Sequence, residues 1–304
     1  MELIYKVKEE EKVVDIIKKK LNISSRLLIK LKAEKAITFN NELIYVNEKV
    51  SKGILKISLD KTDLEEEEKI KEYLNLDIDI SKIDIILEDE YFICVNKPTN
   101  MPVHPSCLHQ GNTLLELVSK YMYSKGFKGK LHIINRLDRE TSGVVILAKH
   151  AYIQECISRQ MADNITDKRY IAVVDGIVEK DTDVIEKNIA RKETSIIERC
   201  VKEDGTGEYA KTEYTVLKRN KEKNYSVLDV KIFTGRTHQI RVHMKSIGHS
   251  ILGDGLYNED KDCKKYIDRV ALHARSLSIV HPVLKTRINI EAKIAEDIKR
   301  LKED

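Results

Sequence analysis

The chain lacks several features that would place a protein quickly in a class. Its 304 residues include no tryptophan, aromatic residues make up 6%, and the five cysteines are far apart. Because no two cysteines are closely spaced, we expect neither a zinc knuckle nor a disulfide framework, but reduced thiols in a cytoplasmic protein. No apolar run is long enough to cross a bilayer, and none follows a basic start as in a signal peptide. We therefore expect no association with a membrane.

Sequence signatures of cofactors and metals are missing as well. The segment Gly253-Asp254-Gly255 lacks the third glycine and the strand–turn–helix frame of a dinucleotide site. No phosphate-binding GxxxxGK[ST] loop, HExxH motif or GxSxG motif occurs. His238 and His243 are five residues apart and do not share a helix face, so packing residues are a simpler interpretation than a metal pair. We expect chemistry by side chains alone, with no cofactor and no metal.

What the chain does have is enough apolar sequence for a core and an uneven distribution of charge. It is 41% hydrophobic and 34% charged, and its length suits one large domain plus a small one. The net charge is +4, but residues 12–35 hold eight basic residues against two acids, whereas 60–82 hold nine acids against four lysines. The basic block suggests a polyanionic partner, although a solvated helix face explains it equally well.

The N-terminal segment predicts a small α/β unit followed by an acidic connection. Apolar spacing indicates a helix over 13–21, and Ser24 is placed to cap a second helix. The run Glu65–Glu68 repels itself, so 60–82 is expected to form a linker in which a short helix is possible. The second helix should project three basic side chains, Arg26, Lys30 and Lys32. Short strands are expected at 37–39, 43–46 and 54–59.

From residue 83 onward, apolar and β-branched runs of strand length dominate. Helical spacing indicates two helices among them, around 153–161 and 240–247, the second ending at Gly248. Strands grouped with occasional helices, without strict alternation, favour an α+β domain over a doubly wound sheet. Strands are expected at 85–87, 92–95, 132–134, 144–148, 170–174, 213–217 and 225–232.

One segment, Asn135–Gly143, is unusually polar for a loop between two apolar strands. Arg136 and Arg139 lie on either side of Asp138 in the sequence. Nearby cations favour the ionised form of a carboxyl group, and an ionised carboxylate at a strand end is a candidate nucleophile. From the residues alone, a structural ion-pair loop is the simpler interpretation.

Two further segments have a similar character. In Thr234–His243 a glycine-containing turn enters a helix with Arg236 at its mouth, which suits an anion such as a phosphate or a buried carboxylate. In Lys168–Gly176, Tyr170 begins a strand, where its ring can pack inside while its hydroxyl stays polar. A core tyrosine is the commoner explanation of this third segment.

Taken in order, these segments resemble the RluA-type RNA pseudouridine synthases, and specifically the RluD-like branch. The resemblance is collinear and covers almost the whole chain. It rests on the following matches: Val95-Asn96-Lys97-Pro98 with Val103-His104-Pro105; Arg136-Leu137-Asp138 with Thr141-Ser142-Gly143; Lys168, Tyr170, Ala172, Val174 and Gly176; Gly235–His243 followed by Gly253-Asp254 and Tyr257; and Ala271-Leu272-His273-Ala274 with His281-Pro282.

The resemblance implies a domain organisation and an RNA partner. Residues 83–304 would form a pseudouridine synthase fold, a mixed, mainly antiparallel sheet flanked by helices and loops. Residues 1–60 would form an S4-like RNA-binding module, joined by an acidic linker over 61–82. Arg26, Lys30 and Lys32 would bind backbone phosphates, which carry no sequence information. No obligate protein partner is implied.

The resemblance also implies roles for five residues. Asp138 would be the nucleophile, attacking the ribose C1′ or the uracil ring. Tyr170 would lie against the uracil and help to remove the C5 proton, and Arg236 would pair with Asp138 and keep it ionised. Leu272 would line the base pocket. Arg136 would fill the space left by the nucleotide, which must be flipped out of its helix to be reached.

Two positions depart from the family's pattern. Asn135 stands where the family commonly has histidine, and we expect its hydrogen bonds to support the loop all the same. In the S4-like segment, Asn40-Asn41-Glu42 replaces a tighter Asn-Gly turn, which predicts weaker RNA affinity.

The expected activity is therefore isomerisation of uridine to pseudouridine, in large-subunit ribosomal RNA or a ribosomal precursor. Alternatives are a synthase for tRNA or several RNAs, and a non-catalytic RNA-binding protein of ribosome assembly. A glycoside hydrolase is a weaker alternative, because it usually needs a second carboxylate and Glu140 is the only acid near Asp138 in the sequence.

Overall fold

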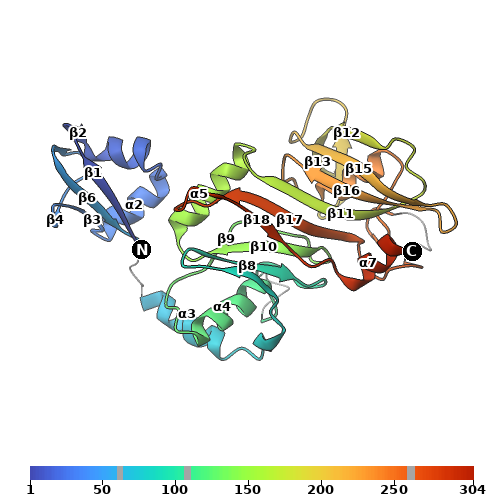
Figure 1. Cartoon of the computed structure of the whole chain (residues 1–304), viewed down its shortest axis with the longest axis horizontal. Coiled ribbons are helices and arrows are strands. Elements are labelled where there is room, and N and C mark those ends of the chain that lie inside the picture. Colours follow the sequence, from blue (N-terminus) through green and yellow to red (C-terminus); the bar gives the residue numbers. More distant parts are fainter. Residues whose placement is uncertain (60–63, 106–110, 259–263) are drawn as a thin grey trace.

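The computed structural model describes residues 1–59, 64–105, 111–258 and 264–304, which form a small N-terminal unit and a larger one (Figure 1). Cys94, Cys156 and Cys200 are free thiols, whereas Cys107 and Cys263 lie outside the described residues. No helix in the described ranges is long and apolar enough to cross a bilayer.

The small unit is a sheet with helices packed against it and has a hydrophobic core of its own. The expected helix over 13–21 is present, although it starts as an α-turn and continues as a π-helix. The sheet order is β1-β6-β3-β4, with β1 (Glu2–Val7), β3 (Ile37–Phe39), β4 (Glu42–Leu43) and β6 (Gly53–Ser58). The other elements are β2 (Glu11–Lys12), α1 (Val13–Asp15), η1 (Ile16–Lys20), α2 (Ser25–Ala33) and β5 (Lys49–Val50).

The second helix, α2, forms as its sequence predicts. The Ser24 hydroxyl accepts a hydrogen bond from the Leu27 amide at 3.2 Å and so caps the first turn. Leu28 and Leu31 are buried in the core of the unit. Its three basic side chains are exposed: Arg26, Lys30 and Lys32.

The turn between β3 and β4 is tight despite its lack of glycine. Asn40 and Asn41 both adopt left-handed backbone conformations, with φ of 51° and 71°. Asparagine tolerates this region better than most residues, and two such residues in succession are typical of the two-residue hairpin turn. The weaker RNA affinity expected from this turn stays a prediction.

Much of the segment expected to be a linker packs against the larger unit. Residues 60–63 lie outside the described ranges, but α3 (Leu64–Leu74) follows them and η2 (Ile80–Lys82) forms a short 3-10 turn. The Tyr73 ring of α3 stacks on Tyr123 of α4 (Leu114–Ser124), with centroids 6.0 Å apart. The possible helix is thus present. The division at residues 60 and 82 stays a prediction.

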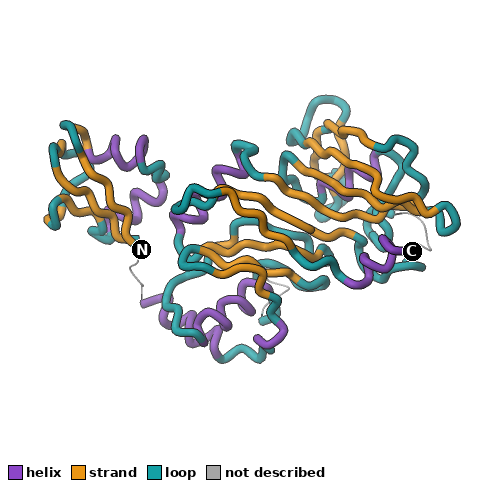
Figure 2. The backbone as a smooth tube through the Cα atoms, viewed as in Figure 1, coloured by secondary structure: helices purple, strands orange, loops and turns teal. Residues whose placement is uncertain are grey.

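The larger unit is built on one mixed sheet, whose strands run through its centre in Figure 2. The order is β12-β15-β16-β11-β17-β10-β8-β7; β18 also pairs with β17, and β9 with β10. Every pairing is antiparallel except β10 with β17. The α+β class and the mainly antiparallel sheet are confirmed.

The bounds of its elements are as follows. The sheet contains β7 (Ile85–Glu88), β8 (Phe92–Lys97), β9 (His132–Ile133), β10 (Ser142–Ala148), β11 (Asp167–Asp175), β12 (Thr182–Glu186), β15 (Lys211–Asn220), β16 (Tyr225–Ile232), β17 (Leu272–Val280) and β18 (Arg287–Glu291). A separate hairpin is formed by β13 (Asn188–Arg191) and β14 (Arg199–Lys202). Besides α4, the helices are α5 (Ala151–Ala162), α6 (Gln239–Ser246) and α7 (Glu296–Glu303).

The parallel contact between β10 and β17 fixes the loop that precedes β10. Gly143 has φ of +115°, and a Cβ there would lie 2.2 Å from the carbonyl oxygen of Ala274. Only glycine fits both this backbone conformation and this close approach. The chain before Gly143 therefore enters the sheet at one fixed position, with Asp138 five residues upstream.

Candidate active site

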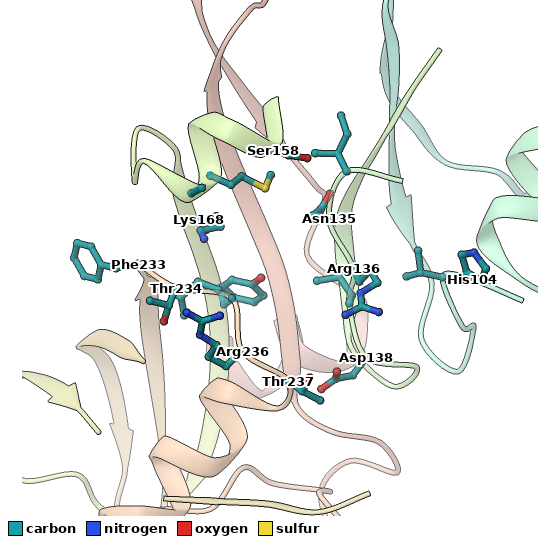
Figure 3. Close-up of a pocket in the computed structure, with 18 of the residues that line it drawn as sticks. His104, Asn135, Arg136, Asp138, Ser158, Lys168, Phe233, Thr234, Arg236 and Thr237 are labelled. Carbon is teal, nitrogen blue, oxygen red and sulfur yellow. The ribbon is translucent and has the colours of Figure 1, made fainter. Parts of the chain in front are cut away.

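The predicted site residues converge on an open cavity of about 840 Å³ (Figure 3). Asp138, Tyr170 and Arg236 all line it, and Arg136 reaches it from the loop before β10. A smaller adjoining cavity of about 90 Å³ is lined by the same four residues and by Leu272. The structure thus brings together five residues that are separated by up to 136 positions in the sequence.

The loop that carries Asp138 is held by backbone and side-chain hydrogen bonds. The Asp138 carbonyl accepts from the Thr141 amide at 3.1 Å, while Leu137 is buried. The Asn135 side chain donates to the Val144 carbonyl at 3.0 Å and accepts from the Ile146 amide at 2.9 Å, so it pairs with β10 like another strand residue. Asparagine therefore supplies the loop support expected of this position.

Lys97 also holds this loop in place, through hydrogen bonds of its side chain. It is fully buried, and its Nζ donates to the carbonyls of Pro98, Met101 and Arg139 at 2.8, 2.9 and 3.0 Å. Burial lowers the pKa of Lys97 to about 7, although the charge of Asp138 acts in the opposite direction. An ammonium has three donors for these three carbonyls, whereas a neutral amine has two.

The cation that contacts Asp138 is Arg241, and the predicted pairing with Arg236 is wrong in this structure. Arg241 Nη1 lies 3.4 Å from Asp138 Oδ2, while Nε and Nη2 bind the two carboxylate oxygens of Asp254 at 2.7 Å each. Burial alone would lower the pKa of Arg241, but the hydrogen bonds and charge of Asp254, helped by Asp138, raise it above its usual value. A permanently charged guanidinium therefore stands beside Asp138.

The difference follows from the positions of the two arginines. Arg241 lies inside α6, where its side chain is 6% exposed and points into the protein. Arg236 precedes the helix, and its guanidinium turns toward Glu208, with Nη1 2.7 Å from Glu208 Oε2 and Nε donating to the Tyr209 carbonyl at 3.0 Å. Figure 3 shows Arg236 and Arg136 projecting from opposite sides of the cavity.

A second polar contact reaches Asp138 from His238. Its Nε2 lies 4.0 Å from Asp138 Oδ1, and its Nδ1 lies 2.7 Å from the Tyr257 hydroxyl. The Tyr257 oxygen also accepts from the Arg199 amide at 2.8 Å, which leaves its own proton for Nδ1 and so favours the tautomer with hydrogen on Nε2. Burial lowers the pKa of His238, so a neutral imidazole presents its N–H to Asp138.

Tyr170 lies on β11 where the pairing with β17 is interrupted. The register shifts between Arg169 and Ile171, and such irregularities redirect side chains beside active sites. Burial, together with the charge of Asp138, raises the pKa of Tyr170. Its hydroxyl therefore keeps its proton at neutral pH, and the ring offers a neutral surface to a base.

The family to which the chain belongs is now clear. Residues 91–246, which include Asp138, Tyr170 and both arginines, match the family described as RNA pseudouridylate synthase. The chain is a member of this family. It is an RNA pseudouridine synthase, an isomerase of the RluA type.

Individual relatives agree with this assignment. The chain is 29% identical over 299 residues to an uncharacterized RNA pseudouridine synthase, YhcT, of Bacillus subtilis, covering 98% of this chain and 95% of that one. It is 34% identical over 229 residues to ribosomal large subunit pseudouridine synthase D of Zymomonas mobilis, covering 72% and 71%. The human RNA pseudouridylate synthase domain containing 1 has the same fold, with a TM-score of 0.59 at 22% identity, covering 71% and 85%.

Five residues of this site were missed in the sequence analysis. Lys97, His238, Arg241, Asp254 and Tyr257 all lie in segments that carry the resemblance, but none of them was assigned to the site there. Arg241 had a detectable signal, because it stands between Ile240 and Val242 on a helix that has to be buried, and a buried arginine requires an acidic partner. His243, in contrast, is a packing residue, bonded to Thr212 and the Lys187 carbonyl.

The three basic residues predicted on the small unit are not part of the Asp138 cavity. Lys30 of α2 lines a separate cavity of about 250 Å³, together with Lys128 and Lys130 of the larger unit. Arg26 and Lys32 are exposed on the same helix.

Proposed function

We propose that this synthase converts specific uridines of large-subunit ribosomal RNA into pseudouridine in the cytoplasm, with Asp138 as its nucleophile. The observation that carries the proposal is the arrangement around Asp138. Its side chain is 30% exposed to an open cavity, while its partner Arg241 is 6% exposed and that residue's other partner, Asp254, is fully buried. A fixed charge thus holds a carboxylate that a substrate can still reach. Relatives named for the ribosomal large subunit support this class of RNA.

The reaction needs no atom beyond those of uridine. Asp138 attacks either the ribose C1′ or the uracil ring, and the bond between N1 and C1′ breaks. The base turns and C5 bonds to C1′, and the bond that Asp138 had formed breaks, which restores the free carboxylate. The C5 proton leaves, and N1 takes up a proton. Because the Arg241 guanidinium cannot lose its proton, its positive charge stays beside the Asp138 carboxylate throughout the approach of the base.

The other predicted residues are proposed to hold the nucleotide. Tyr170 stacks against the uracil, and Leu272, buried at the edge of the smaller cavity, contacts the same base. Arg136 is exposed at the cavity mouth, where it can replace the flipped uridine in the RNA helix. Arg236 contacts substrate rather than Asp138, and help from Tyr170 in removing the C5 proton stays a prediction.

The small unit is proposed to act as an S4-like module that binds RNA phosphates through Arg26, Lys30 and Lys32. All three project from one exposed helix. Changing all three to glutamine should weaken RNA binding and reduce its salt dependence, since each phosphate contact contributes about 0.7–0.9 to the slope of log affinity against log salt. Unchanged affinity and slope would refute this role.

Sequencing of pseudouridines in total RNA tests the target. A strain lacking the gene should lose at least one ribosomal site, which returns with the wild-type gene but not with Asp138→Asn. Loss of sites in tRNA alone would instead favour the tRNA alternative. Restoration by Asp138→Asn would indicate a non-catalytic assembly protein, and release of free uracil in vitro would indicate a hydrolase.

A further inference from the structure

Another, smaller cavity lies beside the active site, and its lining includes three arginines. It has a volume of about 220 Å³ and is bounded by Arg191, Arg199, Glu208 and Arg236, with Ile189, Ala190 and Thr237. Arg236 and Thr237 also line the Asp138 cavity, so the two spaces share a wall. We call it the hairpin cavity, because Arg191 and Arg199 come from the β13–β14 hairpin.

The two hairpin arginines face each other across the strands. Arg191 of β13 is the direct register partner of Arg199 of β14. Directly opposed residues project from the same face of a hairpin with their Cβ atoms about 4.5–5.5 Å apart, and like charges there repel. Such a pair is unfavourable in the free protein unless an anion lies between the two side chains.

No carboxylate of the described residues supplies that anion. Among the described residues, neither Arg191 nor Arg199 forms an ion pair. Arg199 Nη1 donates only to the carbonyls of Ile197 and Glu198, at 3.2 and 3.3 Å. The neighbouring acid, Glu208, is already engaged with Arg236 at 2.7 Å. Its backbone is also fixed, because Glu208 and Ile189 exchange two hydrogen bonds of 2.9 Å.

From this arrangement we propose that the hairpin cavity binds one backbone phosphate of the RNA strand next to the target uridine, between Arg191 and Arg199. Guanidinium groups bind phosphate through paired hydrogen bonds, and two of them around one phosphate remove the repulsion described above. The shared wall with the Asp138 cavity places this phosphate on a nucleotide close to the reacting one. The inference rests on the proposed action on RNA.

The hairpin is also connected to the nucleophile. The Arg199 amide donates to the Tyr257 hydroxyl, Tyr257 contacts His238, and His238 faces Asp138. A phosphate bound to Arg199 would therefore hold β14 in place, and with it the contacts that lead through Tyr257 and His238 to Asp138.

The test uses the full-length protein and two double variants that each remove two positive charges. Arg191→Gln/Arg199→Gln alters the cavity. Lys180→Gln/Lys223→Gln is the matched control, because both lysines are exposed or half-buried surface residues paired with Asp183 and Asp304 at the far end of the sheet. Binding of an end-labelled single-stranded RNA of mixed sequence is measured over a range of salt concentrations.

We expect the arginine double variant to bind roughly tenfold more weakly, because a charge-assisted contact is lost. The slope of log affinity against log salt should fall by about 0.7, the contribution of one phosphate, and not by the ~1.4 of two independent contacts. The lysine control should change neither quantity by a comparable amount. Because neither arginine forms an ion pair with a described residue, the melting temperature of the variant should stay the same or rise slightly.

An unchanged salt slope in the arginine variant, or an equal change in the control, would overturn the phosphate site. Competition of inorganic phosphate with the RNA, abolished by the arginine substitutions, would support it. Tight binding of inorganic phosphate without any effect on RNA affinity would count against it. Pseudouridine formation by the wild-type protein, assayed in parallel, separates failure of this site from failure of the proposed ribosomal RNA activity.

Discussion

Replacement of Arg241 by lysine distinguishes the arginine that contacts Asp138 in the structure from Arg236, the arginine that the sequence resemblance pairs with it. Arg241 uses three nitrogens on two carboxylates, two on Asp254 and one on Asp138. A lysine keeps the charge but offers a single nitrogen, which cannot bind Asp254 bidentately and still reach Asp138. The substitution Arg241→Lys therefore keeps the positive charge but moves it away from Asp138, which weakens the attraction between the two groups.

The size of the effect can be worked from the distance of 3.4 Å between Arg241 Nη1 and Asp138 Oδ2. At an effective dielectric constant of about 20, two unit charges at this separation attract by ~5 kcal/mol. Asp138 is 30% exposed, so solvent screens part of this attraction. We expect a loss of about 2–3 kcal/mol of transition-state stabilisation, which corresponds to a roughly 30- to 150-fold lower rate of the chemical step.

The assay is a single-turnover reaction with ribosomal RNA that carries tritium at uridine C5, because formation of the new carbon–carbon bond releases this hydrogen into water. Arg236→Lys is compared under the same conditions and should change the rate less than about threefold at saturating enzyme, because a lysine retains the charge that contacts substrate. Arg219→Lys is the control for an arginine-to-lysine substitution as such. Arg219 lies at the far end of β15 and is bound to Asp181 and to the carbonyls of Val178 and Glu179.

The reasoning fails if Arg236→Lys lowers the rate strongly while Arg241→Lys leaves it near the wild-type value. That outcome would mean that Arg236 leaves Glu208 and moves to Asp138 when RNA binds, as the sequence resemblance implies. Thermal melting should show Arg241→Lys less stable by about 1–2 kcal/mol, since one charge-assisted hydrogen bond in a buried pair is lost.

Two further predictions concern residues that support the site. Lys97→Met removes a group whose pKa burial lowers to about 7 from an unfolded value of 10.5. Above pH 7 the unfolded chain holds a proton on Lys97 that the folded chain has released. The free energy of unfolding of the wild type, relative to that of Lys97→Met, should therefore rise by up to about 1.4 kcal/mol per pH unit in denaturant titrations between pH 7 and 9. A fall with pH would contradict the buried-lysine assignment. Tyr257→Phe keeps the ring, whose centroid lies 4.9 Å from the Arg241 guanidinium, but removes the hydroxyl bonded to His238. The substitution should lower the free energy of unfolding by about 1 kcal/mol and slow turnover several-fold. It should also shift the NMR titration of His238, which a purely structural tyrosine would leave unchanged.

Local sequence signals were sufficient for much of the fold. β16 was predicted at its observed limits of 225–232 because its residues alternate between the two faces of the sheet. The cap of α2 was predicted because a serine side chain next to an apolar helical repeat has one favourable use. These features depend on neighbours within a few residues, where periodicity and propensity act.

Other elements were missed because their stabilising contacts are distant in the sequence. β17 was not predicted, although it is the central strand between β11 and β10. Its sequence mixes Arg275, Ser276 and Ser278 with apolar residues, and its stability comes from pairing with strands about 100 and 130 residues earlier, which no local pattern reveals. The hairpin β13–β14 was missed for the same reason, and with it the facing arginines.

The choice between Arg236 and Arg241 shows where a motif stops being informative. The two arginines are five residues apart in one of the segments that carry the family resemblance, and both suit an anion chemically. Their assignment depends on Asp254, which lies 13 positions beyond Arg241 and is fully buried. A buried ion pair contributes little net stability, but breaking it leaves an uncompensated charge, so it fixes orientation strongly.

That orientation matters because Asp138 itself is left partly open to solvent. A carboxylate sealed from water would meet no uridine, and one fully hydrated would be a weak nucleophile. In this protein the partners are buried and the nucleophile is not, so the remaining desolvation of Asp138 has to come from the RNA base that enters the cavity. Contacts remote from the reaction, on the hairpin and on the small unit, then contribute to the rate, because their binding energy drives the base into place and expels the water that screens the pair of Asp138 and Arg241.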